Sequence, residues 1–331
     1  MPTALELARA GDERAFRDLI APHRHELLAH CYRLLGSFTD AEDVLQETLL
    51  AAWRGLGGYQ GRAALRTWLY RIATHRCLNA RRDARRRPVE PVPSFTPPEP
   101  TRRGEVTWLQ PWPDAGPEGH HESVAAVELA FVAGLAHLPP RQAAALVLRD
   151  VLDFSSAEVA GLLDTTATVV KGLVQRARAG VARLPERPAV AAEQELAARF
   201  AAAYVAGDVE GVIALLTDDS WLAMPPAPHE YHGRVAIAGF LTASFGSRDR
   251  RVEFVATTVG GGCPAFGSYG GGEAAALIVP TCTSKGIAAI TRFHLPGLFP
   301  TFGLPLSRIE GQPYVPSADI DCHCAQGMAQ S

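Results

Sequence analysis

The sequence predicts a multidomain protein in which two all-α domains precede one α+β domain. Apolar residues recur at helical spacing from residue 3 to 87 and again from 122 to 187. Beyond residue 193, helical segments are followed by β-like runs that glycine triplets separate. Proline-rich stretches divide these regions, because proline interrupts helices and favours extended backbone. We therefore expect domains at 1–87, 122–187 and 193–310, a linker at 88–121 and a tail at 311–331.

The formal net charge of −3 over 331 residues conceals a strong segregation of charge. Arginines crowd residues 62–87, whereas residues 105–122 are acidic. The chain shows no signal sequence and no membrane span, and its 6 cysteines lack the spacing of a disulfide framework. We therefore expect a reduced, cytoplasmic protein. Cys322, His323 and Cys324 supply too few ligands for a tetrahedral site, so we expect no metal and no other cofactor.

Residues 30–87 contain two amphipathic segments joined by a glycine-rich hinge. In the first, Asp40, Asp43 and Glu47 fall on one side of the expected helix, and Ser37 or Thr39 is placed to cap its start. The second carries an apolar stripe, with basic and aromatic side chains on the remainder. These basic and aromatic residues are Arg62, Arg66, Trp68, Tyr70, Arg71, His75, Arg76, Arg81 and Arg82.

The two faces suit different partners. An acidic face suits a basic protein, whereas arginines interleaved with aromatic rings suit phosphates and unstacked bases. The alternative is a helical hairpin whose charges are simply solvated, which is the usual condition of charged helix faces. The specific residues favour the first interpretation.

DAEDVLQETLLAAWRGL, followed by LRTWLYRIATHRCLNARR, resembles the sigma-2 domain of the extracytoplasmic-function (ECF) sigma factors of the sigma-70 family. The resemblance covers about residues 12–87. It implies that Asp40, Asp43, Gln46 and Glu47 bind the clamp helices of the largest RNA polymerase subunit. It also implies that the glycine-rich loop and the basic helix capture a flipped base of the promoter −10 element.

Residues 122–187 contain a second DNA-binding pattern. Residues 156–163 are expected to be the supporting helix of a helix-turn-helix, 164–166 its turn and 167–179 its recognition helix. The runs LPPRQ and QRAR, together with the turn, resemble the sigma-4 domain. The resemblance implies that the recognition helix enters the major groove of the −35 element. The residues expected to contact DNA there are Thr166, Thr168, Lys171, Gln175, Arg176 and Arg178.

The linker contains more aromatic residues than a passive tether needs. Residues 105–114 read EVTWLQPWPD, and a similar run occurs in a subgroup of ECF sigma factors that carries a C-terminal extension. We weigh a docking role for Trp108 and Trp112 against a passive linker. In sigma factors this linker runs toward the RNA exit channel.

The C-terminal region changes in character. Helices are expected near 193–204, 209–216 and 234–245, and strands near 251–259, 275–283 and 287–293. The glycine triplets at 260–262 and 270–272 suit hairpin connections. The region resembles a SnoaL-like domain, an α+β cone shared by small cyclising enzymes, isomerases and non-catalytic binding modules.

Catalysis in this cone requires an acid or base at its mouth. The candidates form no spaced acid–base pair; they are Asp218, Asp219, His229, Glu230, His232 and Glu253. Another set of residues is expected to fill the apolar interior or to line a small-molecule pocket there. This set comprises Trp221, Met224, Tyr231, Phe240, Phe254 and Phe266.

Together these features predict an alternative ECF sigma factor that is not an enzyme. It is expected to bind core RNA polymerase, recognise the −10 and −35 elements and initiate transcription, with its C-terminal domain regulating activity in cis. Its expected partners are core polymerase, promoter DNA and an anti-sigma protein or small-molecule ligand, with no membrane. One alternative is a bifunctional protein whose last domain is an enzyme or ligand sensor. Another is a ligand-sensing repressor that uses the helix-turn-helix alone, which leaves the acidic face unexplained.

Overall fold

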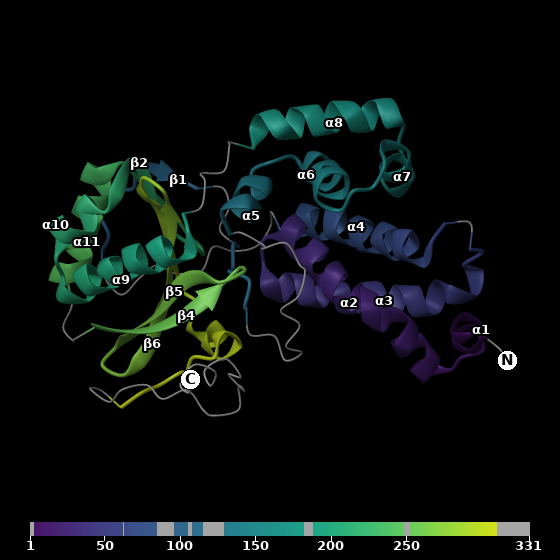
Figure 1. The fold of residues 1–331 in the computed structure, drawn as a ribbon, viewed down its shortest axis with the longest axis horizontal. Helices are drawn as coiled ribbons and strands as arrows, with labels where there is room; N and C mark the ends of the chain where they lie inside the picture. The colour runs from purple at the N-terminus through teal and green to yellow at the C-terminus, as the bar shows by residue number, and fades with distance from the viewer. Residues whose placement is uncertain are drawn as a thin grey trace, which may run out of the picture.

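The computed structural model describes residues 3–61, 63–84, 96–104, 108–114, 129–181, 188–247 and 252–309. Arg62, the tail with Cys322 and Cys324, and the linker residues 88–95, 105–107 and 115–121 lie outside this described part. Figure 1 shows the α+β unit at one end of the long axis and the two helical units packed together at the other, which confirms the predicted fold class. Within the described ranges, no helix combines the length and apolar character needed to cross a membrane.

The first unit packs four helices around an apolar core. They are α1 (Ala4–Arg9), α2 (Glu13–Leu35), α3 (Phe38–Gly55) and α4 (Leu65–Ala84), with the 3₁₀ turn η1 (Leu56–Gly58) after α3. Asp12 caps α2, and Ser37 caps α3 by accepting a hydrogen bond from the Asp40 N–H, as predicted. Gly36 ends α2 with a φ of +74°, a left-handed conformation that glycine adopts without steric cost.

The second unit is the helix-turn-helix domain, which lies against α4. Its helices are α5 (Leu129–Ala136), α6 (Pro140–Leu146), α7 (Ser156–Leu162) and α8 (Ala167–Gly180), with the π-helical turn η2 (Val147–Val151) after α6. Ser155 and Glu158 form a reciprocal capping box at the start of α7, and Thr166 caps α8. The predicted supporting helix, turn and recognition helix are therefore confirmed.

The third unit is a cone built from a curved sheet and three helices. The helices are α9 (Val190–Ala206), α10 (Val209–Ala214) and α11 (Arg234–Gly246). The strands are β2 (Leu216–Met224), β3 (Ala227–His232), β4 (Val252–Val259), β5 (Cys263–Gly270), β6 (Glu273–Thr283) and β7 (Gly286–Phe293), followed by the 3₁₀ helix η3 (Pro296–Phe302). The linker adds a short strand, β1 (Arg102–Arg103).

In the described residues the strands follow the order β1-β3-β2-β7-β6-β5-β4, and β2 pairs with β7 in parallel. Strands β2, β3 and β5 were not predicted from the sequence. β2 lacks a regular alternation of buried and exposed residues, and β5 contains Gly267, Ser268 and Gly270, which have little strand propensity. Pairing with β4 and β6 on either side holds β5 in the sheet. The two glycine triplets connect these hairpins, as predicted.

The sheet has an apolar core on each face. Helices α9 and α11 cover the inner face, where Phe240, Phe266 and Ile290 are buried. On the outer face, Phe293 and residues of η3 belong to a core that continues through the linker into both helical units. The cone is therefore attached to the helical units through buried apolar contacts.

Candidate nucleic-acid interface

The acidic residues expected to bind polymerase lie on the solvent side of α3. Asp43, Gln46 and Glu47 are exposed, and Asp40 is half-buried in the first turn. Arg76 of α4 donates a 2.6 Å hydrogen bond from Nη1 to the Glu47 carboxylate. The acidic face is open to a protein partner, and one end of it is tied to the basic helix.

Four residues of the set expected at the −10 element line one cleft between α3 and α4. The cleft has a volume of about 480 Å³ and is lined by Ala51, Trp68, Arg71, Ile72, His75, Arg76 and Asn79. The lining residues that belong to α4 recur at helical spacing, so they share one face of that helix. Two guanidinium groups, an imidazole and an indole in one cleft are suited to bind phosphates and an unstacked base.

The glycine-rich loop lies beside this cleft. The rings of Tyr59 and Trp68 lie 5.0 Å apart, and the Tyr59 hydroxyl donates a 2.6 Å hydrogen bond to the Ala63 carbonyl. Arg9 of α1 donates to the Leu56 carbonyl at 3.4 Å, and its guanidinium lies 5.9 Å from the Tyr59 ring. The loop is therefore held by contacts at both of its ends.

Two residues of the expected −10 set are buried in this structure, which corrects their assignment to an exposed face. Tyr70 is 0% exposed and packs edge-on against Phe154 of the second unit. Arg81 is 8% exposed and donates hydrogen bonds to the carbonyl oxygens of Ala136 and Leu138. Their spacing follows the buried stripe of α4, so in this conformation neither side chain reaches DNA.

Arg66 is half-buried and engaged within the protein, and Arg82 lies at the surface. The guanidinium of Arg66 lies 4.9 Å from the rings of both Tyr70 and Phe154, and its Nε is 3.3 Å from a carboxylate oxygen of Glu26. Stacking of this kind holds an arginine in place more firmly than a single exposed ion pair does. Arg66 therefore stabilises the contact between the two helical units.

Asp164, in the turn of the helix-turn-helix, joins α4 to the second unit. Its carboxylate accepts a 2.7 Å hydrogen bond from Arg71 Nη2, and His75 Nε2 lies 3.3 Å from its other oxygen. His75 Nε2 also lies 3.0 Å from the Leu162 carbonyl oxygen. Because both partners of the Arg71 pair are more than half exposed, the pair is weak and sensitive to salt. Asp164 was predicted only as a residue of the turn, because no local pattern in the sequence indicates this contact with α4.

The residues expected at the −35 element lie on the exposed side of α8. This side carries Thr166, Thr168, Lys171, Gln175, Arg176 and Arg178, all of them exposed. Thr166 also caps the helix, and Arg178 forms two 2.8 Å hydrogen bonds with the Asp150 carboxylate. Figure 1 shows α8 along the outer edge of the second unit, away from α3. This surface is open to solvent in the structure.

The linker docks on the first unit through its tryptophan-rich segment. Trp108 donates a 2.7 Å hydrogen bond from Nε1 to the Leu35 carbonyl. The Gln110 N–H donates to the Gly36 carbonyl at 2.8 Å, and the Gln110 carbonyl accepts from the Tyr32 hydroxyl at 2.8 Å. The first two bonds satisfy carbonyl groups at the end of α2, and the bond from the Trp108 ring confirms the docking role weighed for that residue.

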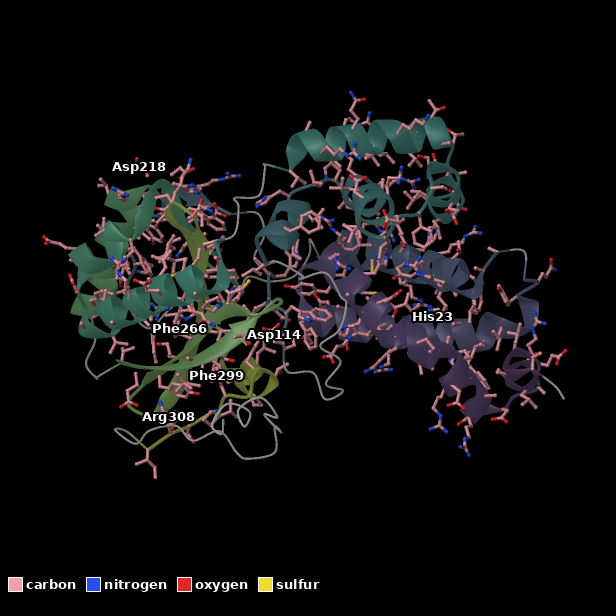
Figure 2. The ribbon with its side chains drawn as sticks, in the orientation of Figure 1. His23, Asp114, Asp218, Phe266, Phe299 and Arg308 are labelled. Atoms are coloured by element: carbon pink, nitrogen blue, oxygen red, sulfur yellow. The ribbon has the colours of Figure 1, made fainter. Side chains whose placement is uncertain are left out.

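Trp112 and Asp114 extend this contact to the cone. The Trp112 ring packs edge-on against the rings of Tyr32 and Phe38, and its carbonyl accepts a 2.9 Å hydrogen bond from the Gly260 N–H. The Asp114 carboxylate accepts from the N–H groups of Gly261 and Gly262 at 2.7 and 2.9 Å. We call this arrangement of Trp112, Asp114 and residues 260–262 the Asp114 clasp; Figure 2 shows Asp114 between the cone and the first unit.

Glycine is required in the clasp turn. Gly261 and Gly262 have φ values of +84° and +82°, so successive N–H groups of the turn converge on one carboxylate. Pro113 also bridges to Val259, at the end of β4. The glycine triplet was predicted as a hairpin connection and Trp112 as a candidate docking residue, but their contact with each other was not predicted.

An earlier part of the linker follows the opposite edge of the sheet. β1 pairs in antiparallel register with β3, and the Gly104 N–H donates to the Pro228 carbonyl at 2.9 Å. The Tyr231 hydroxyl donates to the Pro98 carbonyl at 2.7 Å, and the Thr101 hydroxyl donates to the Glu230 carbonyl at 3.0 Å. The linker therefore binds the cone at the β3 edge and, through the clasp, at the β4 edge.

The residues expected inside the cone pack mainly against one another. Met224, Tyr231 and Phe240 are buried, and the rings of Tyr231 and Phe240 lie 4.9 Å apart. Phe254 stacks on Phe266 at 5.3 Å, so these residues form part of the inner core. Trp221 is half-buried and lies outside that core, where its ring is parallel to that of His232 at 6.4 Å. Asp218 and Asp219, candidates for catalysis, are exposed.

Comparisons with known proteins agree with this division of the chain. Family models match at residues 19–87 (Sigma-70 region 2), 128–179 (Sigma-70, region 4) and 197–297 (SnoaL-like domain). The ECF RNA polymerase sigma factor SigG of Mycobacterium tuberculosis is 40% identical over 325 residues, covering 90% of this chain and 85% of SigG. SigM of the same species is 34% identical over 177 residues, covering 53% of this chain and 79% of SigM.

A solved structure shares the fold over most of the chain. The crystal structure of the M. tuberculosis ECF sigma factor SigJ aligns with a TM-score of 0.57 and 24% identity, covering 88% of this chain and 99% of that one. This likeness supports the fold, and the relationship to SigG extends along nearly the whole chain. This chain belongs to the extracytoplasmic-function family of RNA polymerase sigma factors.

Proposed function

We propose that three surfaces of this sigma factor bind core RNA polymerase and promoter DNA during transcription initiation. The exposed face of α3, with Asp40, Asp43, Gln46 and Glu47, binds the clamp helices of core RNA polymerase. The exposed side of α8 reads the −35 element, with base contacts from polar residues and phosphate contacts from arginines. The cleft between α3 and α4 takes a flipped base of the −10 element, where an aromatic ring and two guanidinium groups offset the cost of unstacking.

We further propose that promoter opening requires the two helical units to separate. In this structure the Asp164 carboxylate forms an ion pair with Arg71 and lies beside His75, and both of these residues line the cleft. A DNA phosphate approaching the same groups competes with this carboxylate for their positive charge. The closed arrangement therefore opposes binding of the −10 element, whereas α8 stays accessible.

The SnoaL-like domain is proposed to regulate this opening in cis without catalysing a reaction. The observation that carries this proposal is the linker bound to both edges of the cone sheet, at β1 and at the Asp114 clasp. A sigma factor's linker runs toward the RNA exit channel when polymerase is bound, so these contacts must break first. The free energy of undocking the linker then sets how readily the protein engages polymerase.

Removal of all residues after Pro188 tests the regulatory role. The shortened protein keeps the residues proposed to bind polymerase and DNA, and its linker has no cone to dock on. Promoter-specific transcription with core polymerase is measured for both forms over a range of protein concentrations. We expect the activity to change; unchanged activity would discard regulation in cis and leave the three proposed interfaces in place.

A further inference from the structure

A polar cluster lies at one end of the cone interior. Arg292 of β7 shares a face of the strand with Ile290, which is part of the inner core, whereas Phe293 packs on the outer face. Arg292 Nη1 donates hydrogen bonds to Ser244 Oγ of α11 at 3.2 Å and to the Tyr204 hydroxyl of α9 at 3.4 Å. The guanidinium is therefore held between the sheet and both covering helices by neutral partners.

Two nitrogen atoms of this cluster are buried without a hydrogen-bond partner among the described residues. They are Arg292 Nε and His294 Nε2. His294 comes two residues after Arg292, just beyond the end of β7, and its backbone N–H donates to the Pro225 carbonyl at 3.1 Å. Burial, with a smaller contribution from the Arg292 charge, lowers the pKa of His294 to about 3, so its imidazole is neutral at physiological pH. Buried donors of this kind normally have partners, because leaving them unpaired costs free energy.

Aromatic rings surround the cluster on its apolar side. The Tyr204 ring stacks on Phe254 and packs edge-on against Phe245, with both centroid distances at 5.0 Å. Phe254 stacks in turn on Phe266, which is labelled within the cone in Figure 2. A guanidinium beside such rings provides charge at one end of a site and a flat apolar contact at the other.

We propose that the cone binds a small aromatic carboxylate, with its carboxylate on Arg292 Nε and His294 Nε2 and its ring beside the half-buried ring of Phe245. One guanidinium and one neutral imidazole supply a single positive charge, which matches a monoanion better than a phosphate dianion. The neutral imidazole donates from Nε2 in the tautomer that carries hydrogen there. This site rests on the geometry of the cluster and stands whether or not the cone regulates transcription.

Isothermal titration calorimetry on the full-length protein tests the site without polymerase or DNA. The probes are phenylacetate and naphthylacetate, each compared with its uncharged amide. We expect the carboxylates to bind and each amide to bind at least about tenfold more weakly, because charge-assisted hydrogen bonds are lost. Failure of both carboxylates to bind at millimolar concentration, or equal binding of acid and amide, would overturn the proposal.

Substitutions locate the binding on the cluster. Arg292→Gln is expected to lower the affinity for the carboxylate about 10- to 100-fold. Arg199→Gln, an equal charge change at an exposed position of α9, is the matched control and is expected to leave the affinity unchanged. Equal losses in both variants would contradict the site. If thermal unfolding shows Arg292→Gln to be unfolded, Arg292→Lys decides: it keeps the charge but lacks Nε, and unaltered affinity would overturn the assignment.

Discussion

The Asp114 clasp offers a sharp test of regulation in cis. Asp114→Ala removes the carboxylate that accepts the Gly261 and Gly262 N–H groups, but leaves the Trp112 carbonyl on the Gly260 N–H. The linker should then undock from the cone more easily. Because undocking precedes binding to polymerase in the proposed scheme, the variant should bind core polymerase more tightly than the unaltered protein.

The structure sets the size of this effect. Hydrogen bonds to a charged acceptor contribute roughly 1.5–3 kcal/mol each. Asp114 is only half-buried, so solvent screening lowers each contribution to about 1–1.5 kcal/mol, and the two bonds together contribute about 2–3 kcal/mol. A change of this size shifts the docking equilibrium roughly 30- to 150-fold, which is the upper limit for the gain in polymerase affinity.

Fluorescence anisotropy of labelled protein titrated with core polymerase measures the gain. Asp114→Asn, which keeps one acceptor oxygen but loses the charge, should give an intermediate affinity. Asp219→Ala removes an exposed carboxylate of β2 in the same domain and serves as the matched control. If Asp114→Ala binds core polymerase no more tightly than Asp219→Ala does, the clasp does not restrain the linker.

Three further predictions follow from the helical units. Asp43→Arg and Glu47→Arg should abolish capture of core polymerase in a pull-down. Glu42→Arg, which changes an exposed residue on the other side of α3, is the control and should still capture it. Retained capture by the first two variants would refute the proposal that the acidic face binds polymerase. Burial of His30 lowers its pKa from 6.5 to about 3 in the folded protein. As the pH falls below about 6.5, this histidine therefore takes up a proton in the unfolded state before it does so in the folded state. The free energy of unfolding should then decrease between about pH 6.5 and pH 3, by up to about 1.4 kcal/mol per pH unit. In urea unfolding, the free energy of unfolding of His30→Gln should depend less steeply on pH than that of the unaltered protein. An equal dependence in the two proteins would contradict the lowered pKa of His30. Gly172→Ala should raise the unfolding midpoint by stabilising α8 by up to ~1 kcal/mol, since the added methyl meets only the end of a flexible side chain; a lower midpoint would show that the glycine is needed there.

Helices were predictable from the sequence because their signals are local. Ser37 and Asp12 cap the helices that follow them, and Gly36 stops α2 within a few residues of its last apolar position. Strands such as β1 and β5 depend on partners elsewhere in the sheet. β1 consists of Arg102 and Arg103 in a proline-rich run, and its strand geometry comes from pairing with β3. No local pattern in the linker indicates that pairing.

Sequence spacing predicts which residues share one face of a single helix, but it does not predict which of these faces another domain covers. Helical spacing places Asp43 and Glu47 on the outside of α3, where the structure has them. The same reasoning assigns Tyr70 and Arg81 to a DNA-binding face, yet packing of the second unit on α4 buries both. The cluster at Arg292 arises only when β7, α9 and α11 meet, so the sequence holds no local signal for it.

Hydrogen–deuterium exchange at Gly261 and Gly262 most directly tests whether the cone holds the linker until polymerase binds. In the free protein the Asp114 carboxylate accepts both N–H groups, so we expect slow exchange at these two amides. If the linker leaves the cone on binding to core polymerase, as proposed, exchange at the same amides should be fast in the complex. Slow exchange at both amides in a complex that initiates transcription would contradict regulation through the linker.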